Sequence, residues 1–302
     1  MGKYKNIRKV RISREDKILY MVCYVILSLL IVVVMYPLIY VLSSSFSSGQ
    51  AVSSGKVLLW PVDFSVQGYK IIFSYKAVWT GYANTIFYTV AATALNLALT
   101  TMAAYPLARR DFYGKGIYML LFMITMFFTG GIIPKYILMS NLNLVNTRWA
   151  IIFSGAISVH NLIIMRTYFQ NSIPGELLEA AKMDGISDIG YLLRIVLPLS
   201  KTIMAVIILY YAVAHWNSYF TAMMYLRDRD LQPLQIVLRD ILNASNIDLS
   251  QIDDAEVLAQ MTGAADLIKY ALIVVSVVPM LCFYPFIQKY FEKGVMIGSV
   301  KG

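Results

Sequence analysis

Hydroxyl and amide side chains recur at helical spacing inside a long apolar segment of the sequence. Thr85, Thr89, Thr93, Asn96 and Thr100 follow one another at steps of three and four residues, which places them on one face of a helix. Such groups can hydrogen-bond a polar solute, but small hydroxyl residues also mediate packing between helices in lipid. The pattern leaves two interpretations open: a hydrophilic path through a membrane, and a packing interface.

Aromatic and polar residues recur in two later apolar segments. Tyr211, His215 and Tyr219 follow one another at steps of four, and Asn161 lies in the preceding segment. Aromatic faces can stack on the apolar faces of sugar rings, while amides and hydroxyls can hydrogen-bond the rims of those rings. His215 by itself is more simply a core histidine than a titrating switch. The candidate substrate path consists of Thr85, Thr89, Asn96, Asn161, Tyr211, His215, Trp216, Asn217 and Tyr219.

Motifs of several catalytic and energy-coupling classes are missing from the sequence. The nearest match to an ATP-binding loop, between Gly49 and Lys56, has the wrong spacing and lacks the Ser or Thr that would hold magnesium. With only two His residues, H-E-x-x-H and His-cluster metal sites are impossible. Proton- and ion-coupled pumps usually need a charge near the centre of a span, and no span has one. We therefore expect no catalytic residue, metal or cofactor on this chain, and energy for any transport from another subunit.

The composition indicates a helical membrane protein. The 302 residues are 59% hydrophobic and only 14% charged, with a mean hydropathy of +0.64, whereas soluble domains average about 45–50% apolar and about 25% charged residues. A helix needs about 20 mostly apolar residues to cross a bilayer. The sequence therefore predicts an all-α membrane domain over 18–290 with six spans, at about 18–42, 82–108, 116–138, 149–169, 202–225 and 267–290.

The distribution of charge predicts the orientation of these spans. Most of the 26 Lys and Arg residues lie in the N-terminal segment 1–17, in the loops after the second and fourth spans, and in the C-terminal tail 291–302. Because excess Lys and Arg mark the cytoplasmic side, both termini are expected to be cytoplasmic. The segment 226–266 is rich in Asp and is expected to form an extracellular loop. The net charge of +9 is thus a signal of topology and not of nucleic-acid binding.

The cytoplasmic loop 170–200 has the pattern of a helix, a turn and a second helix. Pro174 suits the first turn of a helix, and Gly185 can supply the left-handed residue that ends it. Ser187 is a candidate N-cap for a short second helix, and Pro198 stops or kinks that helix before the fifth span. The loop also presents apolar residues beside acids, which favours a protein partner. A helix lying on lipid is the alternative.

The same loop carries a recognisable motif. The motif consists of Glu179-Ala180-Ala181, three residues, Gly185, nine further residues, and then Ile195-x-Leu197-Pro198. It matches the EAA signature of binding-protein-dependent ABC importer permeases at every position. Gly130-Gly131, Ala214–Ser218 and the ending Lys293–Gly302 resemble the carbohydrate-uptake branch, which is MalG-like. The resemblance covers most of the chain and is strongest to the LplC-like oligosaccharide permeases.

This resemblance implies a type I importer fold and a mechanism. In that family the EAA loop docks as a coupling helix into a groove of a separate ATPase, whose closure turns the cavity outward. Glu179 would meet a basic residue of the ATPase, Ala180 and Ala181 would allow close approach, and Gly185 would give the tight turn. The coupling set is Glu179, Ala180, Ala181, Asp184, Gly185, Ile195, Leu197 and Pro198, and a second candidate contact in the tail is Gly294, Met296, Gly298 and Lys301. A frayed end is the alternative for the tail.

The resemblance also implies partners. These are a second homologous permease, which makes a heterodimer, two ATPase subunits that hold ATP and Mg, and an extracellular or lipoprotein solute-binding protein. The expected location is the bacterial cell membrane, with lipid around the helices and an oligosaccharide as substrate. A permease for a non-sugar solute, and a membrane scaffold or receptor that transports nothing, are the alternative functions.

Overall fold

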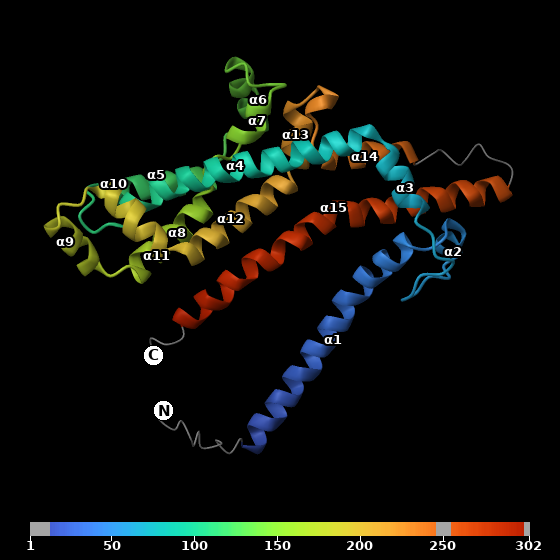
Figure 1. Ribbon diagram of the computed structural model, residues 1–302, viewed down its shortest axis with the longest axis horizontal. Helices are drawn as coiled ribbons and strands as arrows, with labels where there is room; N and C mark the ends of the chain where they lie inside the picture. The colour runs from blue at the N-terminus through green and yellow to red at the C-terminus, as the bar shows by residue number, and fades with distance from the viewer. Residues whose placement is uncertain (1–12, 246–254, 299–302) are drawn as a thin grey trace. The chain divides into compact units, whose positions relative to one another are not determined.

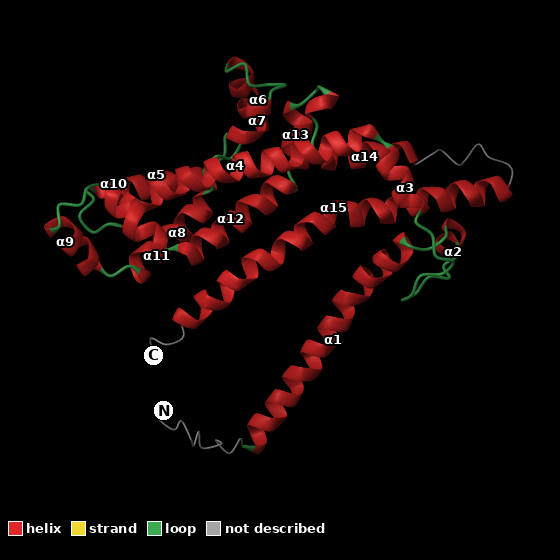
Figure 2. Cartoon of the chain, in the orientation of Figure 1, coloured by secondary structure: helices red, strands yellow, loops and turns green. Residues whose placement is uncertain are grey.

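The computed structural model describes residues 13–245 and 255–298, and the regular elements in these ranges are all helical (Figures 1 and 2). The predicted all-α class is therefore confirmed. The helices are α1 (Arg14–Ser45), α2 (Gly49–Ser53), α3 (Gln67–Ser74), α4 (Lys76–Ala108), α5 (Lys115–Phe127), α6 (Ile132–Asn141), α7 (Arg148–Phe153), α8 (Val159–Ser172), α9 (Gly175–Met183), α10 (Asp188–Tyr191), α11 (Leu197–Leu199), α12 (Lys201–Trp216), α13 (Tyr219–Tyr225), α14 (Leu234–Ser245) and α15 (Ala255–Gly298). A π-helical turn, η1 (Leu192–Val196), joins α10 to α11, and a 3₁₀ turn, η2 (Arg229–Leu231), precedes α14.

Helices of spanning length and apolarity occur in both halves of the chain. Within residues 13–245 and 255–298, three helices qualify: α1, α4 and the part of α15 from Gly263 to Pro285. Two bent pairs bring the number to five if each pair is one span: α5 with α6, at 111°, and Asp188–Leu199 with α12, at 84°. The membrane nature of the chain is thus supported, while the count of six spans and the side of each terminus stay predictions.

Three of the predicted spans are not continuous helices. The segment 116–138 is divided between α5 and α6, 149–169 between α7 and α8, and 202–225 between α12 and α13. Each break has a local cause. Gly131, directly before α6, and Gly155, just after α7, adopt φ values of +87° and +73°, which a right-handed helix cannot contain. The Asn217 side chain, at the end of α12, donates a hydrogen bond to the Val213 carbonyl at 3.0 Å. Helix periodicity and hydropathy do not show such breaks.

The chain divides into two compact units, the first formed by 1–70 and 248–274. In this unit the most apolar window of α1 has no buried residue, as expected of a helix surrounded by lipid. A capping box between Ser13 and Asp16 starts α1. Gly49 and Gly263 bring α2 and α15 into contact, because a Cβ atom on Gly49 would lie only 2.5 Å from the Gly263 carbonyl oxygen. Small residues thus permit the close approach of these helices.

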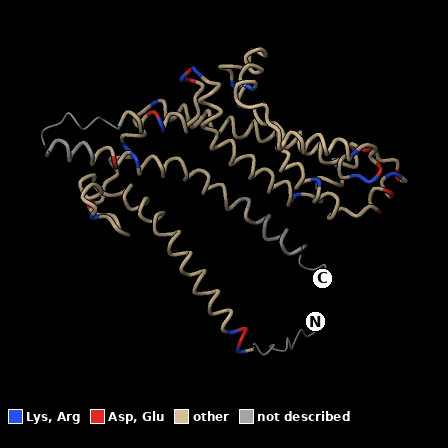
Figure 3. Tube along the Cα trace, turned by 180° about the vertical axis from the view of Figure 1, so that it is seen from behind, with Lys and Arg blue, Asp and Glu red and all other residues tan. Residues whose placement is uncertain are grey.

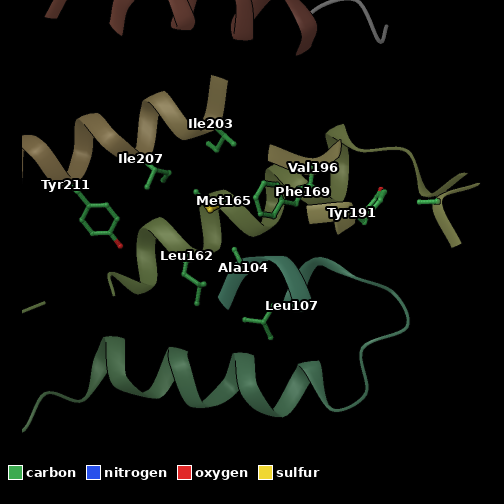
Figure 4. Packing of buried hydrophobic residues seen from close by; sticks show 11 residues of the cluster. Ala104, Leu107, Leu162, Met165, Phe169, Tyr191, Val196, Ile203, Ile207 and Tyr211 are labelled. Carbon is green, nitrogen blue, oxygen red and sulfur yellow. The ribbon is translucent and has the colours of Figure 1, made fainter. Parts of the chain in front are cut away.

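The second unit, 71–247 and 275–302, is built around α4. Helices α8, α12 and α14 pack along α4, and the apolar core at its C-terminal part contains Leu107, Leu162, Met165 and Ile207 (Figure 4). Tyr211 lies at one edge of this core, at the level where polar residues begin. The core therefore fixes α4, α8 and α12 relative to one another on the side facing the loop α9–α10.

The segment predicted as an acidic extracellular loop, 226–266, is mostly helical in its described part. Besides η2 it contains α14 and the first turns of α15, and 246–254 lie outside the described residues. Leu234 and Ile236 of α14 are buried, and Gly81 of α4 approaches the Leu234 backbone closely. The Asn84 side chain donates hydrogen bonds to the Asp230 carbonyl at 2.7 Å and the Gln232 carbonyl at 3.1 Å. These contacts fasten α14 to α4, so this part is not a loose loop.

Candidate functional site

The polar face of α4 is buried in the second unit. Asn96 and Thr100 are 0% exposed and Thr85 is 1% exposed. Thr85 Oγ1 accepts a hydrogen bond from the Leu234 N–H at 2.8 Å, which caps the start of α14 and gives this residue a structural role. The hydroxyls of Thr89 and Thr93 are buried without a hydrogen-bond partner. The part of the face that contains Thr85, Thr89 and Thr93 therefore serves packing. The part that contains Asn96 and Thr100 makes the contacts described next.

Two hydrogen bonds join α4 to α12 at the middle of the unit. Asn96 Nδ2 lies 2.8 Å from His215 Nε2, and Thr100 Oγ1 lies 2.7 Å from the Tyr211 hydroxyl. An amide nitrogen only donates, so in this pair His215 Nε2 is the acceptor. The Tyr211 hydroxyl also accepts the Ser158 N–H at 3.0 Å, and Tyr211 thereby holds the break between α7 and α8 against α12.

A pocket of about 700 Å³ lies beside these bonds. Asn96, Ser158, Asn161, Tyr210, Tyr211 and His215 are among the residues that line it, together with the backbone of the break at Gly155. Its lining contains no Lys, Arg, Asp or Glu. Asn96 Oδ1 is buried and has no hydrogen-bond partner in the described structure, although buried acceptors are nearly always paired. The pocket therefore offers amide, hydroxyl, imidazole and aromatic groups to an uncharged polar ligand surface.

Four of the nine residues predicted for the substrate path meet in this pocket: Asn96, Asn161, Tyr211 and His215. The structure does not bring the other five there. Trp216 Nε1 instead donates to the Ser276 carbonyl of α15 at 3.0 Å, and the Tyr219 ring lies under the Arg239 guanidinium at 5.2 Å. Thr85 and Asn217 are held by the contacts given above, and Thr89 does not line the pocket.

Sequence reasoning missed part of the lining. Tyr210, His160, Ser218 and Thr221 also line the pocket, and the predicted substrate path contained none of them. Ser218 lies at the break after α12, and His160 follows the break before α8. These two residues line the pocket at interruptions of the helices, and a pattern of period 3.6 carries no signal of such interruptions.

The cytoplasmic loop has the predicted helix-turn-helix form. Helix α9 ends at Gly185, whose φ is +71°, and the Ile186 N–H donates to the Ala181 carbonyl at 2.9 Å. The Gly185 N–H donates to the Lys182 carbonyl at 3.1 Å, which completes a Schellman motif. Ser187 caps α10 by accepting the Gly190 N–H, as predicted. The second helix continues through η1 and α11, and Pro198 stands just before the 84° bend.

The residues of the EAA signature divide into a buried and an exposed set. Ala181 is 2% exposed and joins the core, and Ile195 is partly buried against it. Glu179, Ala180, Asp184 and Pro198 are exposed, and Leu197 is intermediate. Two large apolar side chains of the same loop, Met183 and Ile189, are 84% and 72% exposed. One side of the loop is therefore anchored, and the other presents an apolar surface with acids beside it.

Charged residues cluster at the end of the second unit that carries this loop (Figure 3). Asp111 accepts a hydrogen bond from Arg109 Nη2 at 2.6 Å and from Lys182 Nζ at 3.0 Å, and Arg109 also pairs with Asp188. The Arg109 guanidinium, and then Lys182, hold the pKa of the Asp111 carboxyl well below its usual range. Arg109 and Lys182 served only as signals of sidedness in the sequence, and nothing in their spacing indicates that they meet Asp111 and Asp188.

The predicted contact in the tail is only partly described. Gly294, Met296 and Gly298 lie in the last turns of α15, and Lys301 lies outside the described residues. In the part of the chain that the structure describes, no three His, Cys, Asp or Glu side chains converge as a metal site would need.

Comparison with known proteins gives matches over most of the chain. Residues 97–297 match the family described as binding-protein-dependent transport system inner membrane component. The chain is 40% identical over 288 residues to the polygalacturonan/rhamnogalacturonan transport system permease protein YtcP of Bacillus subtilis (strain 168), covering 95% of this chain and 100% of YtcP. It is also 40% identical to Protein LplC of the same organism, over 88% of this chain and 89% of LplC.

A solved structure shares the fold. A chain of a bacterial ABC transporter involved in the import of the acidic polysaccharide alginate matches with a TM-score of 0.82 and 37% sequence identity, over 92% of this chain and 98% of that one. The resemblance seen in the EAA motif is confirmed by these matches. The chain therefore belongs to the family of binding-protein-dependent transport system inner membrane components.

Proposed function

We propose that this chain is the membrane permease subunit of an ATP-driven importer of oligosaccharides or polysaccharide fragments. The observation that carries the proposal is the pocket within the second unit, where uncharged polar and aromatic side chains surround the unpaired Asn96 Oδ1. A sugar hydroxyl can donate to that oxygen, and the Tyr210 and Tyr211 rings can contact the apolar faces of sugar rings. YtcP, described as a polygalacturonan/rhamnogalacturonan transport system permease, and the importer of alginate support the same substrate class.

The energy for import is proposed to come from two separate ATPase subunits that hold ATP and Mg. The exposed side of the EAA loop would dock on an ATPase, with Glu179 facing a basic residue and Met183 and Ile189 entering an apolar groove. Gly294, Met296, Gly298 and Lys301 are proposed as a second contact. A single chain forms half of the pore, so a second, related permease is needed, and a solute-binding protein delivers the substrate outside the cell.

Uptake measurements in a deletion strain test this function. The strain is complemented with the wild-type chain, and uptake of radiolabelled oligogalacturonate is measured beside that of a neutral oligosaccharide and an amino acid. We expect uptake of one of the two sugars to depend on the chain. Uptake of the amino acid alone would assign the chain to a non-sugar solute, and no change in any uptake would indicate a scaffold.

A variant in the pocket tests the proposed substrate contact. Asn96→Ala removes the unpaired oxygen together with the amide that donates to His215 Nε2. The loss of one hydrogen bond to the substrate, about 0.5–1.5 kcal/mol, corresponds to roughly 2- to 13-fold in affinity. We expect the half-saturating sugar concentration for uptake to rise by that factor. Thr89→Ala is the matched control, because it removes an unpaired hydroxyl of the same helix that does not line the pocket. Equal effects of the two variants would contradict the contact.

A further inference from the structure

Four charged side chains from three segments meet beneath the end of α4. Arg109 follows the last residue of α4, Asp111 lies in the next loop, Lys182 is in the last turn of α9 and Asp188 is the first residue of α10. The Arg109 side chain is only 15% exposed, whereas those of Asp111, Lys182 and Asp188 are 44%, 54% and 65% exposed. The guanidinium is therefore the centre of the group, with its partners around it.

All three nitrogens of the Arg109 guanidinium donate hydrogen bonds. Arg109 Nε donates to Asp111 Oδ1 at 2.8 Å and Nη2 donates to Oδ2 at 2.6 Å, which is a bidentate pair. The remaining nitrogen, Nη1, donates to the Asp188 carboxylate and to the Tyr105 hydroxyl at 3.3 Å. The Tyr105 hydroxyl in turn donates to the Asp188 carbonyl at 3.3 Å. A lysine ammonium cannot make this set of bonds, because it lacks the planar fork.

These bonds reach both halves of the EAA loop. Lys182 precedes the turn at Gly185 and Asp188 follows it, so the group fastens α9 and α10 to the same point at the end of α4. The Lys115 ammonium adds a bond to the Arg109 carbonyl at 3.3 Å, from the start of α5. The loop is thus fixed to α4 on both sides of its bend, and not only through the apolar core.

Helix α4 continues from this point to the pocket. Thr100 and Asn96, which bond Tyr211 and His215, lie on the same helix, and the path from Arg109 to Asn96 is about 20 Å at 1.5 Å per residue. Pro106 lies between these two residues and lacks an N–H for the helical hydrogen bonds, but α4 stays helical through it and can carry a displacement along its axis. A movement of the EAA loop therefore has a direct mechanical route to the groups that line the pocket.

We propose that Arg109 is a positioning residue that couples the EAA loop to α4, so that movement of the loop changes the Asn96–His215 and Thr100–Tyr211 contacts. This inference rests on the proposed function, in which an ATPase moves the loop. Arg109 touches neither substrate nor nucleotide. Its role is to keep α9, α10 and α4 moving as one body.

The test compares four variants in the assembled transporter with its ATPase and binding protein. Arg109→Gln removes the charge, Arg109→Lys keeps the charge without the fork, and Asp188→Asn removes one partner. Arg110→Gln is the matched control, since this exposed neighbour forms no ion pair within the part of the chain that the structure describes. Basal ATP hydrolysis, hydrolysis stimulated by oligogalacturonate with its binding protein, uptake, and ATPase co-purified per permease are measured for each.

The expected result is a loss of coupling without a loss of assembly. In Arg109→Gln and Arg109→Lys, uptake and stimulated hydrolysis fall about tenfold, while basal hydrolysis and co-purified ATPase stay within twofold of wild type and of the control. If Arg109→Gln does not reach the membrane, the same loss of uptake and of stimulated hydrolysis is looked for in Asp188→Asn, which leaves the Arg109–Asp111 pair in place.

Two results would overturn the inference. One is uptake within twofold of wild type in both Arg109 variants or, where these do not reach the membrane, in Asp188→Asn. The other is a fall in uptake that merely parallels the loss of co-purified ATPase, which would give Arg109 a role in assembly alone. Failure of the proposed function is distinct, since the wild-type transporter itself would then show no sugar uptake.

Discussion

The turn at Gly185 sets the angle between the two helices of the EAA loop, and its backbone conformation allows a graded test. Gly185 has a φ of +71°, and nothing lies within 4 Å of the position that a Cβ atom would occupy. Any cost of Gly185→Ala is therefore conformational and not a clash with neighbours. A left-handed conformation costs an L-residue about 1–2 kcal/mol, which lowers the population of this turn about 5- to 30-fold relative to alternatives.

Other residues at the same position extend the series. Asn tolerates the left-handed region better than Ala, so Gly185→Asn should cost less. Proline fixes φ near −65° and lacks the N–H that bonds the Lys182 carbonyl, so Gly185→Pro cannot form the turn. We expect sugar uptake and substrate-stimulated ATP hydrolysis to fall in the order Gly, Asn, Ala, Pro, with neither detectable for Pro, while insertion into the membrane is unchanged.

The assay measures uptake, stimulated hydrolysis and the amount of inserted protein for each variant. Gly175→Ala is the control, because Gly175 also has open space around its Cβ position but lacks the left-handed conformation. Intact coupling in Gly185→Pro would refute the role of the turn. An equal loss in Gly175→Ala would show that any change in the loop has this effect, which would also refute it.

Three further predictions follow from contacts elsewhere. Gly263→Ala should destabilise the first unit by about 1–3 kcal/mol, because its Cβ would lie 2.8–2.9 Å from the Gly49 backbone, and the melting temperature in detergent would show this. Tyr211→Phe removes the hydroxyl that holds the break between α7 and α8, and should lower stability in the same assay by about 1–3 kcal/mol. The lowered pKa of Asp111 means that its stabilisation is present above the usual carboxyl pKa and is lost as the pH falls through the lower, folded value. The difference in melting temperature between wild type and Asp111→Asn should thus stay constant from about pH 8 to about pH 5 and shrink below that; a difference that grows on acidification would contradict the ion pairs.

Composition and local motifs were enough to predict the fold class and the form of the EAA loop. Long apolar segments must be helical in lipid, since no water is there to satisfy an open backbone. The turn at Gly185 and the cap at Ser187 follow from residue types that act within a few positions, and the structure has both. Interactions of this range are visible in a sequence because they need no knowledge of distant partners.

Features that depend on distant contacts were not predictable in the same way. The pairing of Arg109 with Asp188 joins residues far apart in the chain, and nothing in either neighbourhood indicates it. Helical spacing placed Thr85 and Asn96 on the same face, but only the position of α14 decides that Thr85 caps a helix while Asn96 lines the pocket. The breaks within three predicted spans are local in cause, yet hydropathy averages over them.

The interruption at Gly155 places bare peptide groups, and not only side chains, at the wall of the pocket. Amide and carbonyl groups there are the same whichever residue occupies the position. An alanine scan would leave them unchanged and would therefore undercount the groups that discriminate one cargo from another. Replacing single peptide bonds by esters along this stretch would measure how much these backbone groups contribute to substrate selectivity.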